Sequence, residues 1–367
     1  MSTARPLCEV ARVFLKLGTI GFGGPAAHIA LMRDEVVVRR RWIDDQGFLD
    51  LVGACNLIPG PNSTELAIHL GRRRAGRAGL VVAGVCFIVP AAAIVGVLAW
   101  AYVRYGTMPV ATDLLWGVKA VMIAIVSGAV VAFARTAVRG LPTGAVAVAA
   151  CFLYILGTNE LAILAGGAVV IAASRFAGAP VVFLAMPIPQ PADSDLWRLA
   201  LVFGKVGSLL FGSGYVLLAF LENDLVKTYG WLTQSQLLDA VSIGQVTPGP
   251  VFTTALFIGY LLAGWVGAAV ATVAIFLPSF VFVALTHNLV TKIRASTWAS
   301  AALDGVNAAA VGLLAGVLFV LAREVFRDPW AIPVAAAAAV FAFATKVNTV
   351  WLVAAGALLG LSRTLLF

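Results

Sequence analysis

The chain has little charge and few of the side chains that catalysis or metal binding requires. Only 11% of its 367 residues are Asp, Glu, Lys or Arg, whereas a soluble chain carries about a quarter. Its three histidines and four cysteines form no CxxC pair and no metal-ligand spacing. No HExxH, GxSxG, Walker A or GxGxxG motif is found. We therefore expect no soluble enzyme, no nucleic-acid-binding protein, no disulfide scaffold, and no metal or cofactor.

Apolar sequence extends along the whole chain instead. Hydrophobic residues make up 61% of it, and its mean hydropathy is +0.99. A membrane-spanning helix needs about 20 such residues, so the sequence predicts an all-α polytopic membrane protein in the lipid bilayer. The net charge of +8 has two compatible explanations, which are basic cytoplasmic loops that orient the protein and an anionic substrate.

The chain contains an internal duplication. Residues 14–61 align without a gap on residues 203–250, a shift of 189, and 14 of these 48 positions are identical. The identical pairs include Lys16 with Lys205, Trp42 with Trp231, Asp50 with Asp239, and Pro59-Gly60-Pro61 with Pro248-Gly249-Pro250. Apolar composition alone would not match a Lys, a Trp and a proline pair in register. We expect a first repeat over residues 1–176, a Pro-rich linker over 177–196 and a second repeat over 197–367.

The distribution of arginine predicts that the two repeats are inverted. The basic loops 32–46 and 72–77 flank the apolar segment 47–71, and both belong on the cytoplasmic side only if that segment is re-entrant. Each repeat then has about five spans plus one re-entrant or broken helix, so the second repeat begins on the opposite side. Its equivalent loops, 222–235 and 260–264, contain no arginine. Inverted repeats are typical of secondary transporters.

Two Pro-Gly-Pro sequences interrupt apolar segments at equivalent places. Proline ends a helix because it cannot donate a backbone hydrogen bond, and the residues that follow can begin a half-helix whose N-terminus favours an anion. We expect the two half-helices to converge on one substrate site near the middle of the membrane. The alternative is a simple proline kink. The expected site residues are Asn56, Pro59, Gly60, Pro61, Asn62, Ser63 and Thr64, with Gln245, Pro248, Gly249, Pro250, Thr253 and Thr254 in the second repeat.

A second group of candidates lies near the start of each repeat. Small residues there could expose backbone amides to an oxyanion, or simply allow close helix packing. These are Phe22, Gly23, Gly24 and Pro25, and in the second repeat Phe211, Gly212, Ser213 and Gly214. Lys16 and Lys205 precede them by six residues. A cation in an apolar segment costs about 2.5–3.5 kcal/mol, so each lysine should face a substrate or a partner, unless it reaches an interface.

The remaining ionisable residues are candidates for coupling or for structure. His28 and Glu65 could carry a coupling proton, although the residue aligned with Glu65 is Thr254. Asp50 and Asp239 are expected to cap helices. Lys119 and Asp304 are isolated charges whose partners the sequence does not indicate. Gly312 and Gly316 form a GxxxG face that could pack within the chain or in a homodimer.

The combination of these motifs resembles the chromate transporter (CHR) family. FGGP at 22–25, the spacing to Trp42, the Pro-Gly-Pro segment and the second copy of each correspond to the long, two-domain form, over nearly the whole chain. The resemblance implies a bacterial protein of the cytoplasmic (inner) membrane that exports chromate. It also implies that the FGGP and Pro-Gly-Pro sequences are functionally sensitive. The second FGGP reads FGSG at 211–214, so the two half-sites need not be equivalent.

The function that we expect is therefore secondary transport of chromate outward by alternating access, driven by the membrane potential or by proton exchange. A carrier of sulfate or of oxyanions in general is the closest alternative, because sulfate has the same shape and charge. An anion channel of the same fold is a second alternative. An intramembrane enzyme acting on lipid-linked phosphate is a third, but it would need paired acids or a metal site, and only Glu65 lies near the first Pro-Gly-Pro sequence.

Overall fold

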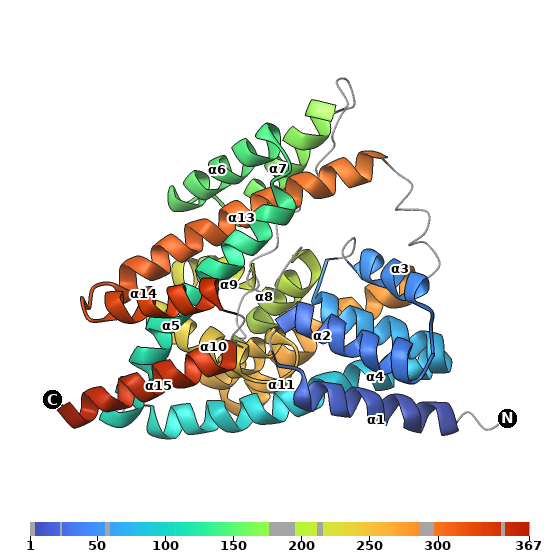
Figure 1. Ribbon diagram of the computed structural model, residues 1–367, viewed down its shortest axis with the longest axis horizontal. Coiled ribbons are helices and arrows are strands. Elements are labelled where there is room, and N and C mark those ends of the chain that lie inside the picture. Colours follow the sequence, from blue (N-terminus) through green and yellow to red (C-terminus); the bar gives the residue numbers. More distant parts are fainter. Residues whose placement is uncertain are drawn as a thin grey trace. The chain divides into compact units, whose positions relative to one another are not determined.

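The fold is helical in every part of the chain that the structure describes (Figure 1). The computed structural model describes residues 4–22, 24–55, 59–106, 108–175, 195–210, 216–286, 297–345 and 349–366, and no strand occurs among them. The helices of the first repeat are α1 (Ala4–Ile20), α2 (Gly24–Arg33), the π-helix η1 (Asp34–Arg39), α3 (Asp45–Cys55), α4 (Asn62–Tyr105), α5 (Pro109–Ala137), α6 (Leu141–Ile155) and α7 (Glu160–Arg175).

The second half of the chain has the same order of elements. They are α8 (Asp195–Leu209), α9 (Leu217–Leu221), the π-helix η2 (Glu222–Thr228), α10 (Gln234–Val246), the 3₁₀ helix η3 (Val251–Thr253), α11 (Thr254–Thr286), α13 (Thr297–Val325), α14 (Ala331–Ala344) and α15 (Thr349–Leu366). Even the hydrogen bonds that follow the π-helices recur in register. Trp42 donates its backbone N–H to Val36, and Trp231 donates to Leu225. The internal duplication is thus visible in local structure as well as in sequence.

The long helices α4 and α11 each reverse direction within their length. Ala75 and Gly76 leave helical geometry, and Gly76 has a φ of +65°. A Cβ on Gly71 would lie 2.3 Å from the carbonyl oxygen of Gly79, although eight residues of continuous helix would separate them by about 12 Å. Residues 62–74 therefore form a short arm that folds back on residues 77–105. Ala263 and Gly264 make the same reversal in α11.

Four helices among the described residues are long and apolar enough to cross a membrane. They are α4, α5, α11 and α13, whereas α6, α14 and α15 are shorter apolar helices. The first apolar segment is broken, because α1 ends at Ile20 and α2 begins at Gly24. The polytopic helical prediction is confirmed, while the expected count of five spans per repeat stays a prediction.

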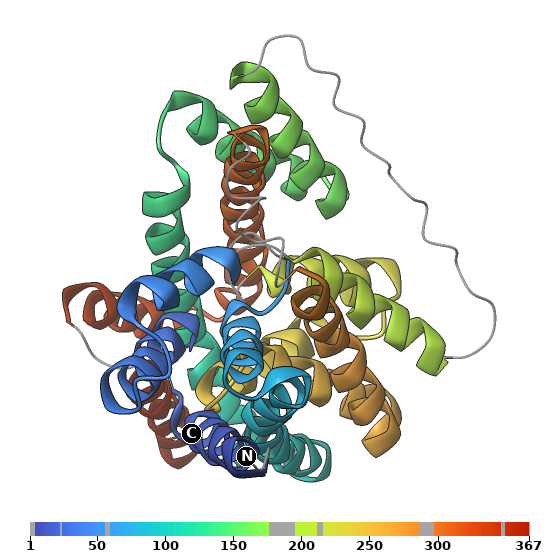
Figure 2. The ribbon, with the colours of Figure 1, turned by 90° about the vertical axis from the view of Figure 1, so that its right-hand side faces the viewer.

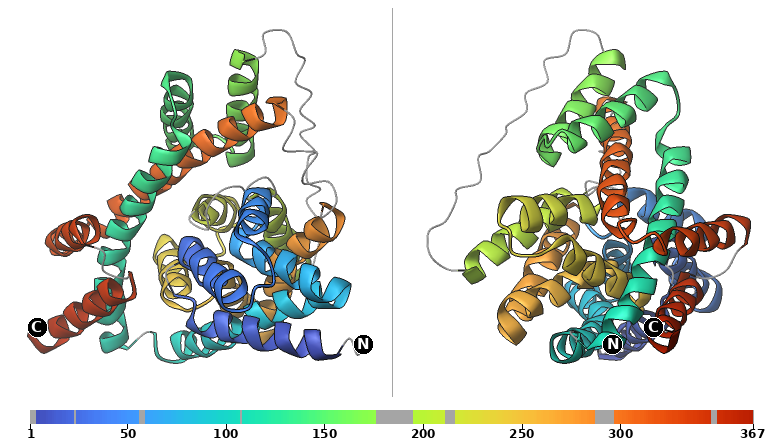
Figure 3. Two further views of the ribbon diagram at one scale, coloured as in Figure 1. Left: turned by 45° about the vertical axis from the view of Figure 1, so that its right-hand side comes forward. Right: turned by 90° about the vertical axis from the view of Figure 1, so that its left-hand side faces the viewer.

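The described chain forms two compact units, and each unit draws on both halves. Unit 1 contains residues 1–106, 196–214 and 240–292, and unit 2 contains residues 107–195, 215–239 and 293–367. Helices α1, α4 and α11 pack together in unit 1 (Figure 2). In unit 2, α13 packs against α5, α6 and α7 (Figure 3).

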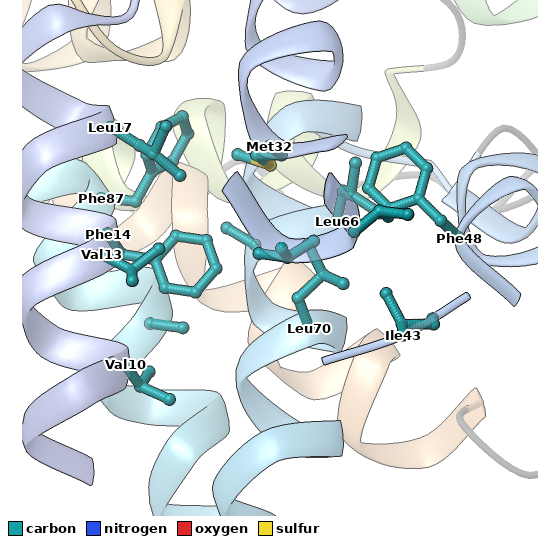
Figure 4. Packing of buried hydrophobic residues seen from close by; sticks show 14 of the residues in the cluster. Val10, Val13, Phe14, Leu17, Met32, Ile43, Phe48, Leu66, Leu70 and Phe87 are labelled. Carbon is teal, nitrogen blue, oxygen red and sulfur yellow. The ribbon is translucent and has the colours of Figure 1, made fainter. Parts of the chain in front are cut away.

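Unit 1 has an apolar core that holds its short helices in place. Phe14 of α1 and Phe87 of α4 are fully buried, and they are joined by Met32 of α2, Phe48 of α3 and Leu66 from the arm at the start of α4 (Figure 4). In a membrane, close van der Waals packing rather than removal from water is what such side chains contribute to stability. This core fixes α1, α2 and α3 against the arm at the start of α4.

Close contacts between small residues hold unit 2 together. A Cβ on Gly312 would lie 2.1 Å from the carbonyl oxygen of Ala147, and one on Gly316 would lie 2.8 Å from Tyr154. The GxxxG face of α13 is therefore occupied within the chain by α6, which is one of the two outcomes that the sequence left open.

Candidate functional site

Both Pro-Gly-Pro sequences end one helix and begin another, as the sequence predicts. The first PGP segment (59–61) lies between α3 and α4, and the second PGP segment (248–250) lies between α10 and η3. Pro61 and Pro250 are extended residues that precede the new helices. The carbonyl of Pro61 accepts the backbone N–H of Thr64, and that of Pro250 accepts the N–H of Thr253. Each PGP segment is thus followed directly by a helix N-terminus.

Reciprocal hydrogen bonds join each PGP segment to the other half of the chain. The N–H of Gly60 donates to the carbonyl of Leu210 at 2.7 Å, and the N–H of Gly249 donates to the carbonyl of Gly21 at 2.8 Å. Gly60 and Gly249 differ by 189 in residue number, and so do Gly21 and Leu210, which is the shift that aligns the two repeats. Each acceptor lies directly after the first helix of its half, so the two halves are bound by equivalent exchanged contacts within unit 1.

A small pocket lies where the two PGP segments meet. Its cavity volume is only about 10 Å³, which is about the room that one water molecule needs, so a larger ligand requires the lining residues to move apart. No Lys, Arg, Asp or Glu side chain lines it. Its lining residues are Pro25 and His28 of α2, Pro61, Asn62 and Ser63 at the start of α4, and Pro250, Val251 and Phe252 at the start of η3. Two helix N-termini from different halves therefore converge here. Each N-terminus carries a partial positive charge of about half an elementary charge. The pocket can therefore attract an anion although no lysine or arginine lines it.

Several buried polar atoms in this region have no hydrogen-bond partner among the described residues. They are Nδ1 of His28, Oγ1 of Thr64 and Nε2 of Gln245. The exposed fraction of each of these residues is 7% or less. Buried polar groups normally have partners, and each unmet group costs about 1–3 kcal/mol. Unmet buried polar atoms beside a pocket are groups that a ligand can satisfy.

Glu65 lies buried beside the first PGP segment. Its exposed fraction is zero. Ser279 of α11 donates to its Oε1 at 3.3 Å, and its Oε2 has no partner among the described residues. A Cβ on Gly60 would lie 2.3 Å from Oε1. The carboxyl group therefore packs directly against the glycine that the exchanged hydrogen bond holds.

The structure does not bring Lys16 to the pocket. Its ammonium group lies 2.9 Å from Oε2 of Glu35, and its side chain is 45% exposed. Arg40 donates to the other oxygen of Glu35 and also pairs with Glu9. Burial alone would raise the pKa of Glu35, but hydrogen bonds from Lys16 and Arg40 outweigh it, so this pKa lies below its usual value. Lys205, at the equivalent place in α8, is half-buried and does not line the pocket either.

The other candidates divide between the pocket region and residues that the structure does not describe. Pro25 lines the pocket, Gly24 begins α2, and Phe22 is 37% exposed. The hydroxyls of Thr253 and Thr254 donate to carbonyls at the start of their own helix. Gly23, Asn56, Phe211, Gly212, Ser213 and Gly214 lie outside the described residues.

Several charges that the sequence left without partners pair in unit 2. Lys119 lies 3.0 Å from Asp239, and Asp304 forms ion pairs with Arg139 and Arg175. Asp50 lies inside α3 and Asp239 lies inside α10, rather than at the helix starts, so the expected capping role is wrong for both. No cluster of three metal-ligating side chains occurs among the residues that the structure describes.

Sequence reasoning missed some residues of this site. Val251 and Phe252 line the pocket, and Ser279 contacts Glu65, yet none of them was singled out. The first two directly follow the second PGP segment, so the position of Asn62 and Ser63 in the repeat could have identified them. Ser279 is 214 residues from Glu65, and no local pattern indicates it.

Comparison with known proteins identifies the family. The chromate transporter family matches residues 8–172 and again residues 197–361. The chain is 33% identical to the chromate transport protein of Cupriavidus metallidurans, over 97% of this chain and 92% of that one. It is 31% identical to the chromate transport protein of Pseudomonas aeruginosa, over 95% and 90%, and 32% identical to a probable chromate transport protein of Synechococcus elongatus, over 89% and 87%. No solved structure is significantly similar to it.

The family match covers both repeats and agrees with the motifs in the sequence. This family consists of membrane transporters and not of enzymes. Together with its apolar helices, the match makes the chain a multi-pass membrane protein, and chromate is the substrate that the family name gives. The chain belongs to the chromate transporter family.

Proposed function

We propose that this protein exports chromate across the bacterial cytoplasmic membrane by alternating access, with the pocket between the two PGP segments as the substrate site. The observation that carries the proposal is the convergence of two helix N-termini, one from each repeat, on one pocket. The groups that we expect to bind chromate are the backbone amides and polar side chains at the start of α4 and η3. We expect the other candidates named from the sequence beside these two helix starts, or in the segments that lead to them, to contribute to the same site.

The chemistry of the pocket suits a tetrahedral dianion. Backbone N–H groups at a helix start point along the helix axis, and water-excluded surroundings strengthen their interaction with an anion. Asn62 and Ser63 can donate further hydrogen bonds to its oxygens.

The duplicated architecture supports alternating access. The exchanged hydrogen bonds of Gly60 and Gly249 are equivalent in the two repeats. In an inverted arrangement, the second repeat could adopt in one conformation the structure that the first repeat adopts in the other, so that the site opens to each side of the membrane in turn. The contrast in arginine content between equivalent loops supports that inversion. The repeats at 1–176 and 197–367 would then be the two members of the inverted pair.

Two driving forces are compatible with this site. With the cell interior negative, outward movement of two negative charges is favoured by about 4.6 kcal/mol per 100 mV, at about 2.3 kcal/mol per charge. Proton exchange would instead use a titrating group beside the pocket, for which Glu65 and His28 are the candidates.

The test is chromate uptake into everted membrane vesicles, with and without excess sulfate. The altered protein carries Pro59→Ala and Pro248→Ala, which remove the first proline of each PGP segment. A matched control carries Pro142→Ala and Pro333→Ala, two prolines in the first turns of α6 and α14 in unit 2. We expect saturable, energised uptake that the first pair of changes abolishes and the control pair retains.

Other results would change the conclusion. Strong competition by sulfate would make the protein a general oxyanion carrier. Conductance at rates beyond carrier turnover, without counterflow, would make it an anion channel. No uptake by correctly inserted protein would refute chromate export.

A further inference from the structure

His28 is held in a defined orientation inside unit 1. The exposed fraction of this residue is 2%, and its ring lies edge-on to Phe87 with 5.4 Å between centroids. Its Nε2 lies 2.8 Å from the carbonyl oxygen of Gly21. A carbonyl oxygen can only accept a hydrogen bond, so Nε2 must carry the hydrogen. The same carbonyl also accepts the N–H of Gly249, which ties the imidazole to the second PGP segment.

This orientation decides what the other ring nitrogen can do. In a neutral imidazole with hydrogen on Nε2, Nδ1 has a lone pair and no hydrogen. Nδ1 is buried and has no partner among the described residues, and His28 lines the pocket. An oxyanion offers only acceptor oxygens, so a bare Nδ1 beside it would repel it, whereas a protonated Nδ1 would donate a hydrogen bond to it.

We propose that the pocket binds its oxyanion together with one proton, which lies between Nδ1 of His28 and the nearest oxygen of the anion. The proton comes from solvent when the anion binds and leaves with the anion on the other side. Chromate beside a protonated imidazole and hydrogen chromate beside a neutral imidazole have the same atoms and the same charge. The inference rests on the proposed function and specifies the form in which the substrate is carried.

The direction of proton movement follows from this arrangement. In proton exchange, the coupling group would lose its proton when the anion arrives. At His28 the anion and the proton favour each other, so they travel together. Each turnover then moves one net negative charge instead of two, which halves the electrical drive.

Many of the charged groups on the neighbouring elements have other partners, although no partner is seen for Arg5 and Arg12 of α1 or for Arg73, Arg77 and Arg104 of α4 among the described residues. The elements packed against α2 are α1, η1, α3 and α4. Their ion pairs and hydrogen bonds are Lys16 with Glu35, Arg40 and Arg74 with Glu9, Asp34 with Arg39, Asp45 with Arg33, Asp50 with Gln46, Arg72 with the carbonyls of Val283 and Ala284, and Glu65 with Ser279. Buried His69 follows Glu65 by one helical turn. Glu65 is the acid nearest the pocket along α4, so the test must separate its proton from that of His28.

The test counts protons taken up on binding by the purified full-length protein in detergent. Calorimetric titration with chromate in buffers of different ionisation enthalpy gives the number directly, at mildly alkaline pH where free chromate is the dianion and an ordinary imidazole is neutral. We expect one proton per chromate and a dissociation constant that rises tenfold for each unit of pH. Sulfate stays a dianion throughout this range, so a proton taken up with sulfate must reside on the protein.

Two variants assign the proton to its residue. His28→Gln keeps an N–H that can donate to Gly21 but removes the titrating group, so proton uptake should fall to zero and the pH dependence should flatten. Glu65→Gln should retain uptake of one proton. If Glu65→Gln abolishes the uptake instead, the assignment to His28 is wrong.

The outcomes for the unaltered protein separate this inference from the proposed function. Chromate binding without proton uptake would overturn the inference and leave the pocket as a substrate site. No binding of either chromate or sulfate would overturn both. If His28→Gln fails to fold, the proton count of the unaltered protein with sulfate still decides whether the protein takes up a proton.

Discussion

Replacing Gly60 with alanine would test the close packing around the first PGP segment. Gly60 has a φ of +141°, in a region that residues with a Cβ rarely adopt. An added Cβ would lie 2.3 Å from Oε1 of Glu65 and 2.7 Å from Oγ of Ser279. Both distances are shorter than non-bonded atoms tolerate, so the carboxyl group, the hydroxyl or the backbone would have to move.

The expected cost has two parts. A residue with a Cβ held in such a sparsely populated backbone region costs about 1–3 kcal/mol, and crowding in a packed interior costs about 1–3 kcal/mol. Gly60→Ala should therefore destabilise the protein by about 2–6 kcal/mol, a large share of a typical unfolding free energy of about 5–15 kcal/mol. It should also reduce transport, because the exchanged hydrogen bond to Leu210 depends on this backbone position.

Gly76 provides a matched control. It also has a positive φ, +65°, but no atom lies within 4 Å of its added Cβ. Gly76→Ala should therefore cost only the backbone strain of about 1–3 kcal/mol. Thermal unfolding in detergent and vesicle uptake should be measured for both variants side by side. If Gly60→Ala and Gly76→Ala have equal effects on both, the close approach of Gly60 to Glu65 is refuted.

Further predictions concern the packing of unit 2 and the ion pair of Lys16. Gly117→Ala would place a Cβ 1.9 Å from the carbonyl oxygen of Gly356 and should cost about 1–3 kcal/mol in thermal unfolding. Gly128→Ala in the same helix meets no atom within 4 Å and should stabilise the protein by up to about 1 kcal/mol; equal effects would contradict the α5–α15 contact. Because the pKa of Glu35 is lowered in the folded protein, its stabilising contribution is present above its unfolded-state pKa and is lost as pH falls through the folded value. The stability difference between the protein and Glu35→Gln should thus vanish in acid, and a difference that is constant with pH would exclude the ion pair as its cause. Lys16→Met and Glu35→Gln should be non-additive in a double-mutant cycle of unfolding free energies if Lys16 acts through Glu35, whereas additive effects would show that Lys16 acts elsewhere.

The sequence predicted the centre of this site because its signals are local and duplicated. Proline and glycine determine where a helix ends, so the starts of α4 and η3 follow from the PGP segments themselves. The repeat supplied the long-range information, since equivalent breaks in two related halves are placed to meet. The two PGP segments and their equivalent places in the repeats were sufficient for this prediction.

Pairings between distant residues could not be predicted in the same way. Lys16 pairs with Glu35 across a helix break, and Lys119 pairs with Asp239 across 120 positions of sequence. Neither partner follows a fixed helical spacing, so only the folded arrangement identifies them. The sequence also did not predict which helices form each compact unit, because each unit takes its helices from both repeats.

The two halves of the site have the same backbone plan but different chemistry. Gly60 and Gly249 make equivalent exchanged hydrogen bonds, yet the residue aligned with His28 in the second repeat is Leu217, and the residue aligned with Glu65 is Thr254. If the two halves alternate between equivalent conformations as proposed, titratable groups on one side alone would make the balance between these conformations depend on bound protons. Because His28 and Gly249 share the carbonyl of Gly21, any movement of the second PGP segment away from that carbonyl also changes the surroundings of the imidazole. The side chains that break the symmetry are therefore placed where the two halves exchange their backbone contacts.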